Sequence, residues 1–142
     1  MARIVINKAV MSEVIAGVLV LLFVYTAASK LVDREAFEYQ ISKQPLPEWF
    51  NDLLVWALPI AELTTSLVLL PRATRKIGML ISFVLMMCFT VYVGLAVLNV
   101  FGEVPCSCGG VLQSLSWEAH LVFNVVFLGI ATVGWWIVRS DQ

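Results

Sequence analysis

Four long apolar runs separated by short polar segments make up most of the chain. The runs extend over about residues 10–29, 53–70, 77–100 and 117–138. Each is close to the roughly 20 residues that a helix needs to cross the hydrocarbon core of a bilayer. The pattern therefore predicts an all-α fold, a polytopic membrane four-helix bundle that forms a single domain over residues 1–142.

The longest polar segment, residues 32–52, separates the first two runs. Within it Phe37 and Ile41 are four residues apart with charged residues between them, which is typical of a short amphipathic surface helix. The prolines that follow should end this helix. The aromatic pair Trp49-Phe50 should then anchor the second span at the membrane interface.

The first apolar run lies near the N-terminus and shares features with a secretory signal peptide. It is longer than the apolar core of about 7–15 residues that such peptides have. It also contains Glu13, and Thr26-Ala27-Ala28 is a poor cleavage site. We therefore expect a retained membrane helix.

The distribution of basic residues predicts the orientation. The short second loop has Arg72, Arg75 and Lys76, whereas the third loop, residues 101–116, has no basic residue. The basic residues of the first loop are dispersed among acids and count for less. By the positive-inside rule we expect a multi-pass protein of the bacterial inner membrane with both termini cytoplasmic and the third loop facing the periplasm.

Composition supports the membrane class and narrows the function. Hydrophobic residues make up 61% of the 142 residues and charged residues 13%, against about 25% charged residues in soluble domains. A net charge of -1 without a basic run offers no footprint for nucleic acid. Membrane lipid and envelope proteins are therefore the expected partners.

Cys106 and Cys108 form a Cys-X-Cys pair in the third loop, between a proline and two glycines. Thiols in an oxidising compartment usually form disulfides or help to form them. A disulfide across one intervening residue is strained and easily reduced, and so small a ring adds little stability. These properties favour a redox pair over a passive staple or a simple turn. A zinc site with His120 as an extra ligand would still be one ligand short.

His120, the single histidine, lies one turn into the fourth span, and Asn124 follows four residues later on the same face. His120 could transfer a proton during thiol exchange, or it could bond a loop carbonyl at the membrane interface. Both interpretations stay open. Cys88, in the middle of the third span, is expected to be a small buried hydrophobe too deep to contact the cysteine pair.

Glu62 lies near the middle of the second span, where a carboxylate costs at least about 2–3 kcal/mol unless it is paired or protonated. It should face the bundle interior, as a proton relay, a polar contact to a quinone headgroup, or an interhelical hydrogen bond that fixes packing. Lys30 could stabilise a thiolate or an acidic partner, although snorkelling to lipid phosphate is the favoured interpretation. Tyr25 and Ser29 place hydroxyls on one face at the same level.

Three segments together resemble the methylamine-utilisation protein MauE family, within the DoxX-like membrane proteins. They are Phe23-Val-Tyr-Thr-Ala-Ala-Ser-Lys-Leu31, Pro59-Ile-Ala-Glu-Leu63 and Pro105-Cys-Ser-Cys-Gly-Gly110. The resemblance covers nearly the whole chain, and the paired-cysteine loop is its most specific part.

The resemblance implies a bundle distantly similar to vitamin K epoxide reductase, and a role in disulfide formation or electron delivery with a periplasmic thioredoxin-like partner. It implies that Cys106 and Cys108 are the redox pair and that Ser29, Lys30 and Glu62 occupy matching family positions. Better-known quinone-coupled enzymes have Cys-X-X-Cys and a second cysteine pair, which this chain lacks. The next redox station must then be another protein or a bound small molecule, for which a quinone is the candidate.

Two functions from different classes follow. The first is a membrane thiol–disulfide oxidoreductase in which Cys106 and Cys108 are catalytic and His120 assists them. The second is a non-enzymatic membrane subunit that anchors or assembles an envelope complex, with the cysteine loop as a structural turn.

Overall fold

The computed structural model describes residues 2–100 and 116–140, with side chains from residue 8 onward in the N-terminal part. Its elements within these residues are helices: α1 (Ala2–Val32), α2 (Arg34–Ser42), α3 (Glu48–Leu69), α4 (Arg75–Val97) and α5 (Trp117–Ser140). Four of them, α1, α3, α4 and α5, are long and apolar enough to cross a membrane. The predicted all-α membrane bundle is confirmed.

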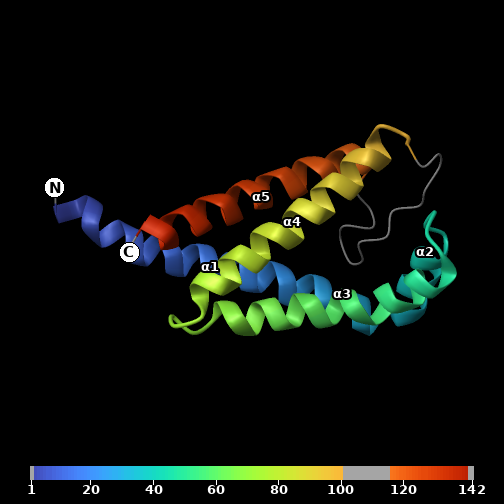
Figure 1. Cartoon of the computed structure of the whole chain (residues 1–142), viewed down its shortest axis with the longest axis horizontal. Coiled ribbons are helices and arrows are strands. Elements are labelled where there is room, and N and C mark those ends of the chain that lie inside the picture. Colours follow the sequence, from blue (N-terminus) through green and yellow to red (C-terminus); the bar gives the residue numbers. More distant parts are fainter. Residues whose placement is uncertain (1, 101–115, 141–142) are drawn as a thin grey trace.

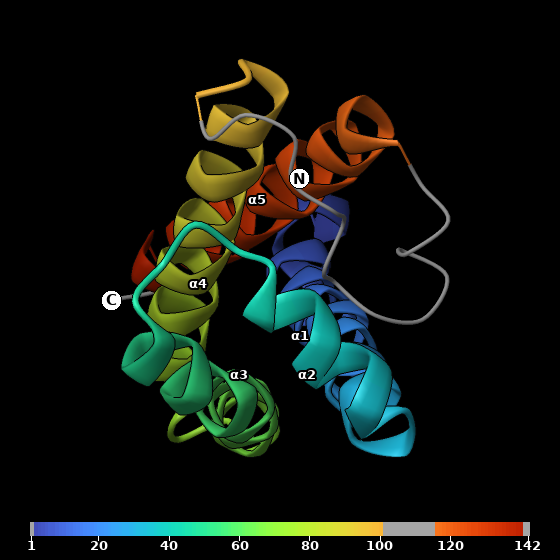
Figure 2. The same ribbon diagram turned by 90° about the vertical axis from the view of Figure 1, so that its right-hand side faces the viewer.

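The four long helices form two pairs. Helix α1 packs along α3, and α4 packs along α5. The pairs meet at the end of the bundle that holds both termini and the α3–α4 turn, and they diverge toward the opposite end, where α2 lies (Figures 1 and 2). The hydrophobic core lies where the two helix pairs meet. It includes Leu19, Phe23, Leu69, Met79, Met86 and Ala131.

The helix boundaries differ from the predicted spans by up to about eight residues, because α1 begins at Ala2 and not near residue 10. Helix α3 begins at Glu48, so Trp49 and Phe50 belong to its first turn and do not precede it. Helix α4 ends at Val97, three residues before the predicted end of the apolar run. Asn99 adopts a φ of 59° there. The Val100 and Asn99 N–H groups donate to the carbonyls of Leu95 and Ala96, a Schellman ending that side-chain hydrophobicity does not signal.

The short helix α2 is amphipathic, as predicted. The Asp33 carboxylate accepts from the Ala36 N–H at 3.4 Å and caps the helix N-terminus. Phe37 and Ile41 are the buried residues of α2. The helix therefore lies with its apolar face against the diverging ends of the long helices, near the site described below.

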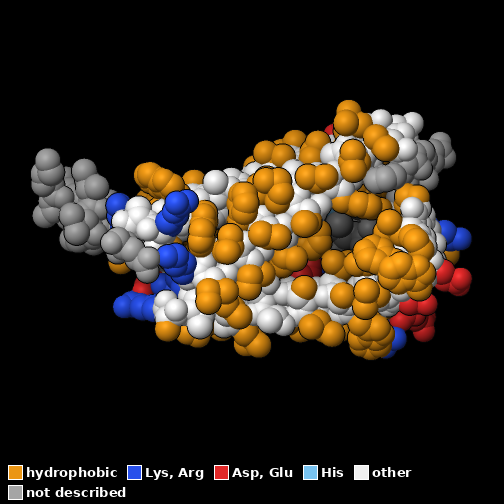
Figure 3. Space-filling view, in the orientation of Figure 1, with side chains coloured by type: hydrophobic (Ala, Val, Ile, Leu, Met, Phe, Trp, Pro, Cys, Tyr) orange, Lys and Arg blue, Asp and Glu red, His pale blue; other side chains and the backbone are white. Residues whose placement is uncertain are grey.

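On the face seen in Figure 3, apolar side chains are spread along the length of the bundle and charged side chains gather at its two ends. Large hydrophobic residues such as Leu21, Leu67, Val122 and Trp136 are exposed. A bilayer would cover this surface, because a soluble monomer rarely exposes so extensive an apolar face. The exposed basic residues of the α3–α4 turn include Arg72, which is paired with Glu13 of α1.

A close helix contact at Gly134 of α5 supports a prediction about stability. A Cβ atom added at Gly134 would lie 2.8 Å from Ile15 Cγ2 and 2.8 Å from Met79 Sδ. We expect Gly134→Ala to lower the free energy of unfolding by about 1–3 kcal/mol, because the added methyl overpacks a junction of three helices. The matched control is Gly129→Ala on the same helix, where an added Cβ has no neighbour within 4 Å. Unfolding in mixed micelles measures both, and equal stabilities would contradict so close a contact at Gly134.

Candidate functional site

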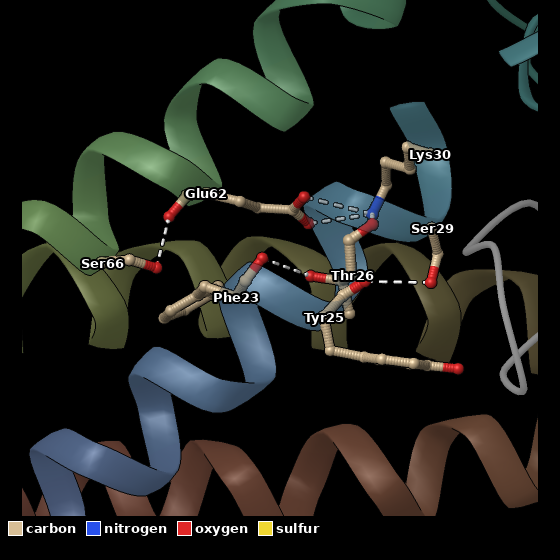
Figure 4. A network of polar contacts seen from close by, with 7 residues as sticks. All are labelled: Phe23, Tyr25, Thr26, Ser29, Lys30, Glu62 and Ser66. Carbon is tan, nitrogen blue, oxygen red and sulfur yellow. Dashed lines mark hydrogen bonds and ion pairs between the residues drawn. The ribbon is translucent and has the colours of Figure 1, made fainter. Parts of the chain in front are cut away.

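A buried ion pair joins α1 to α3. The Lys30 Nζ atom lies 2.9 Å from Glu62 Oε1 and 3.2 Å from Oε2, and it also donates to the Thr26 carbonyl at 3.3 Å (Figure 4). Only 5% of Lys30 and 2% of Glu62 is exposed. Glu62 faces the interior as predicted. The favoured interpretation of Lys30 is wrong, because its ammonium points inward to the carboxylate instead of outward to lipid phosphate.

Two hydroxyl side chains near Glu62 on α3 are bonded to carbonyls of the same helix. Ser66 Oγ donates to the Glu62 carbonyl at 3.0 Å, and Thr65 Oγ1 donates to the Ala61 carbonyl at 2.7 Å. Pro59, one turn before Glu62, lies inside α3 and has no N–H to donate. The Ser66 and Thr65 hydroxyls therefore donate to backbone carbonyls and not to the Glu62 carboxylate.

A cavity of about 370 Å³ lies beside this ion pair, between α1, α3, α4 and α5 and next to α2. Its volume is within the range of small-molecule pockets, about 300–1,000 Å³. Most of its wall is apolar, including Leu22, Phe23, Leu58, Leu85, Phe89 and Phe123. Figure 3 shows the molecule hollowed between α4 and the α2–α3 part of the bundle. The divergence of the two helix pairs creates this space.

His120 and Asn124 reach the cavity from the first turns of α5. His120 is 1% exposed and Asn124 is 4% exposed. The prediction that these two side chains lie on one face of the helix is confirmed, and this face points into the bundle. The His120 ring stacks on that of Trp117, with 6.2 Å between centroids and 14° between planes. The His120 ring therefore lies buried at the cavity wall, and both of its interpretations stay predictions.

Gln44 and Tyr92 close the cavity toward α2, and the sequence did not single them out. The Tyr92 hydroxyl and Gln44 Oε1 form a hydrogen bond, and Gln44 Nε2 donates to the Gln40 carbonyl at 3.1 Å. Both residues line the cavity. The available signal was a tyrosine near the end of an apolar span, but its partner is 48 positions away in sequence.

Two other predicted residues lie at the edge of this arrangement. Ser29 Oγ donates to the Tyr25 carbonyl at 2.9 Å (Figure 4), and Ser29 is not among the described residues that line the cavity. Cys88 lines the cavity and is exposed. The expectation that Cys88 is buried is therefore wrong.

Cys106 and Cys108 lie outside the described residues. The chain enters and leaves their segment at Val100 and Ser116, at the end of the bundle where α2 lies (Figure 1). The cavity lies toward this same end, since Gln44, Tyr92 and His120 line it. Among residues 2–100 and 116–140, no group of three or more His, Cys, Asp or Glu side chains could hold a metal ion.

Fold and composition together define a multi-pass helical membrane protein. Residues 8–137 match the family model described as methylamine utilisation protein MauE, and the chain belongs to this family. No curated protein and no solved structure matches the chain. The wider likeness to DoxX-like proteins and to vitamin K epoxide reductase stays a prediction.

Proposed function

We propose that this protein is a membrane thiol–disulfide redox protein whose Cys106 and Cys108 exchange electrons with a periplasmic thioredoxin-like partner. The observation that supports the proposal is the cavity with its buried Lys30–Glu62 pair, because it lies toward the end of the bundle at which α4 ends and α5 begins, the two helices that flank the cysteine segment in sequence. A single cysteine pair needs a further electron carrier. An apolar cavity with a few polar groups suits a membrane-soluble carrier.

The exchange with the partner is a two-electron reaction. A partner thiolate attacks one sulfur of the Cys106–Cys108 disulfide, and the other sulfur leaves as a thiolate. The second partner thiolate then attacks the partner sulfur of this mixed disulfide. The partner leaves with a disulfide, and Cys106 and Cys108 hold the two electrons and, once protonated, two protons. Reduction of the partner uses the same steps in reverse.

A quinone is the candidate carrier for these electrons, and when bound it supplies a two-electron, two-proton acceptor. The residues of the cavity fit such a group, because the walls are apolar and the charges of Lys30 and Glu62 compensate each other. His120 is the candidate residue for moving a proton between the thiols and the cavity. We assign Ser29 no direct contact with the carrier, because its hydroxyl is bonded to the Tyr25 carbonyl.

The basic α3–α4 turn sets the proposed orientation. Arg72, Arg75 and Lys76 lie at the same end as both termini (Figure 1), and basic loops stay on the cytoplasmic side. The opposite end then faces the periplasm, in reach of a soluble thioredoxin-like protein. From the family description we infer an accessory role in methylamine utilisation for this exchange.

Covalent trapping tests the proposal. Cys106→Ser and Cys108→Ser each remove the second thiol that would cleave a mixed disulfide between the remaining cysteine and the partner. At least one of the two variants should therefore hold the partner as a mixed disulfide. We expect an adduct on non-reducing gels that disappears with reductant, and mass spectrometry of the adduct should give a thioredoxin-like protein. The double variant, which keeps Cys88, is the control and should give no adduct. If both single variants insert into the membrane and neither gives an adduct, the result would favour the non-enzymatic anchoring subunit.

A further inference from the structure

The segment that joins α2 to α3 forms part of the cavity wall at the end of the bundle where α2 lies. Within residues 41–50, which we call the lid segment, Ile41, Gln44, Leu46 and Phe50 line the cavity. The lid segment belongs to the α1–α3 side of the molecule, because it runs directly into α3 and because α2 packs against α3.

Hydrogen bonds around the lid segment hold the Gln44 side chain in place. The Gln44 N–H donates to the Ile41 carbonyl at 3.0 Å, and the Leu46 N–H donates to the Gln44 carbonyl at 2.8 Å. The Gln44 Nε2 atom donates to the Gln40 carbonyl at 3.1 Å. The amide oxygen Oε1 then accepts from the Tyr92 hydroxyl of α4. This bond to another helix therefore uses a side chain that is already fixed and is only 6% exposed.

The Gln44–Tyr92 hydrogen bond crosses between the two helix pairs where they diverge. The pairs α1/α3 and α4/α5 meet at the opposite end of the bundle (Figures 1 and 2). Close packing fixes them there, since a Cβ atom added at Gly134 of α5 would lie 2.8 Å from Ile15 of α1. A separation of the pairs at the α2 end would break the Gln44–Tyr92 bond and open the cavity beside it.

The bond lies near one surface of the membrane. Tyr92 is separated from Arg75, the first residue of α4, by about 26 Å of helix rise, and the hydrocarbon core of a bilayer is about 30 Å thick. An opening beside Tyr92 therefore leads to the aqueous surface and not to the bilayer centre. Water that entered there would reach Lys30 and Glu62, which line the same cavity.

We propose that the Gln44–Tyr92 hydrogen bond is a latch that holds the lid segment closed over the cavity, and that its release admits water and small polar solutes to the Lys30–Glu62 pair. With the latch closed, the ion pair lies in apolar surroundings, where the attraction between two charges is strong. With the latch open, water screens both charges. That this regulates a redox site rests on the proposed function, whereas the opening itself does not require thiol exchange.

A cysteine at a buried position of the cavity measures the opening. The reporter is Asn124→Cys, because Asn124 is 4% exposed and lines the cavity. The three native cysteines are replaced by serine, and the protein is in phospholipid nanodiscs. The probe is methanethiosulfonate ethylsulfonate, a small charged thiol reagent that does not enter lipid. Ser116→Cys in the same background is the reference for an exposed thiol. We expect the reporter to react much more slowly than this reference.

Removal of the latch should speed the reaction of the reporter. Tyr92→Phe and Gln44→Leu should each raise its rate about two- to tenfold, because one hydrogen bond contributes about 0.5–1.5 kcal/mol and tenfold corresponds to about 1.4 kcal/mol. The double variant should react no faster than the faster single variant, because both substitutions remove the same bond. The matched control is Tyr39→Phe, which removes the hydroxyl of an exposed tyrosine of α2 and should leave the rate unchanged.

Several results would overturn the latch. The reporter reacts as fast as Ser116→Cys in the parent, or it stays unreactive in every variant, or Tyr92→Phe and Gln44→Leu leave its rate unchanged. An equal increase in Tyr39→Phe, or a double variant whose increase is the product of the two single increases, would also contradict a shared bond. Because the reporter protein has no native thiol, failed trapping of a partner would overturn the thiol exchange and leave the latch in place.

Discussion

Glu62→Gln should lower the free energy of unfolding by about 3–5 kcal/mol, because it leaves the Lys30 ammonium buried without a counter-charge. Both side chains are almost fully buried, and the Lys30 Nζ atom contacts both carboxylate oxygens. The substitution keeps the shape of the side chain, so the loss reports on charge and not on packing. Titration with a denaturing detergent in mixed micelles, followed by circular dichroism, measures it.

The matched control for this variant is Glu38→Gln on α2. Glu38 also pairs with a basic residue, Arg34, at 2.6 Å, but 44% of the Glu38 side chain and 48% of the Arg34 side chain is exposed. Exposed pairs of this kind contribute about 0–1 kcal/mol. We therefore expect a change of at most about 1 kcal/mol for Glu38→Gln. A similar small change for Glu62→Gln would contradict a strongly coupled buried pair.

A double variant separates pairing from burial. In Lys30→Met/Glu62→Leu both charges are removed and two apolar side chains of similar size remain. Replacement of a buried ion pair by apolar residues is often neutral or stabilising, so the double variant should be more stable than Glu62→Gln. If Lys30→Met, Glu62→Leu and the double variant show simply additive losses, the two side chains do not interact in the folded protein.

Loss of thiol exchange is the second large effect that we expect. Cys106→Ser/Cys108→Ser should leave the thiols of periplasmic partner proteins in the same redox state as deletion of the whole protein. Serine cannot form the disulfide that accepts electrons, and a ring across one residue contributes little to stability. The variant should therefore fold and insert as the parent does. Gel-shift alkylation of the partner thiols in intact cells measures their redox state.

The matched control for the cysteine pair is Cys88→Ser. Cys88 lies in α4 at the wall of the cavity and should take no part in the exchange, so partner thiols should keep their parental redox state. If the partner thiols keep their parental redox state in the double variant, the proposed redox function is wrong. If Cys88→Ser changes the redox state of the partner thiols instead, the reactive thiol is Cys88 within the membrane and not the pair in the third loop.

The sequence by itself determined the architecture. The bilayer requires long apolar helices, so four apolar runs predicted α1, α3, α4 and α5, although α1 begins about eight residues before its predicted span. The spacing of Phe37 and Ile41 likewise defined the amphipathic helix α2. The interior position of Glu62 followed from the energy of a carboxylate in hydrocarbon, and the shared face of His120 and Asn124 followed from helix periodicity.

Only the tertiary structure decided which residues meet. Lys30 and Glu62 are 32 positions apart, and their pairing depends on how α1 and α3 are rotated against each other. Hydrophobicity does not reveal that rotation, because the lipid-facing and interior faces of a membrane helix are both apolar. For the same reason Cys88 was expected inside and is exposed. The cavity arises from the divergence of two helix pairs, a property of packing that no single segment encodes.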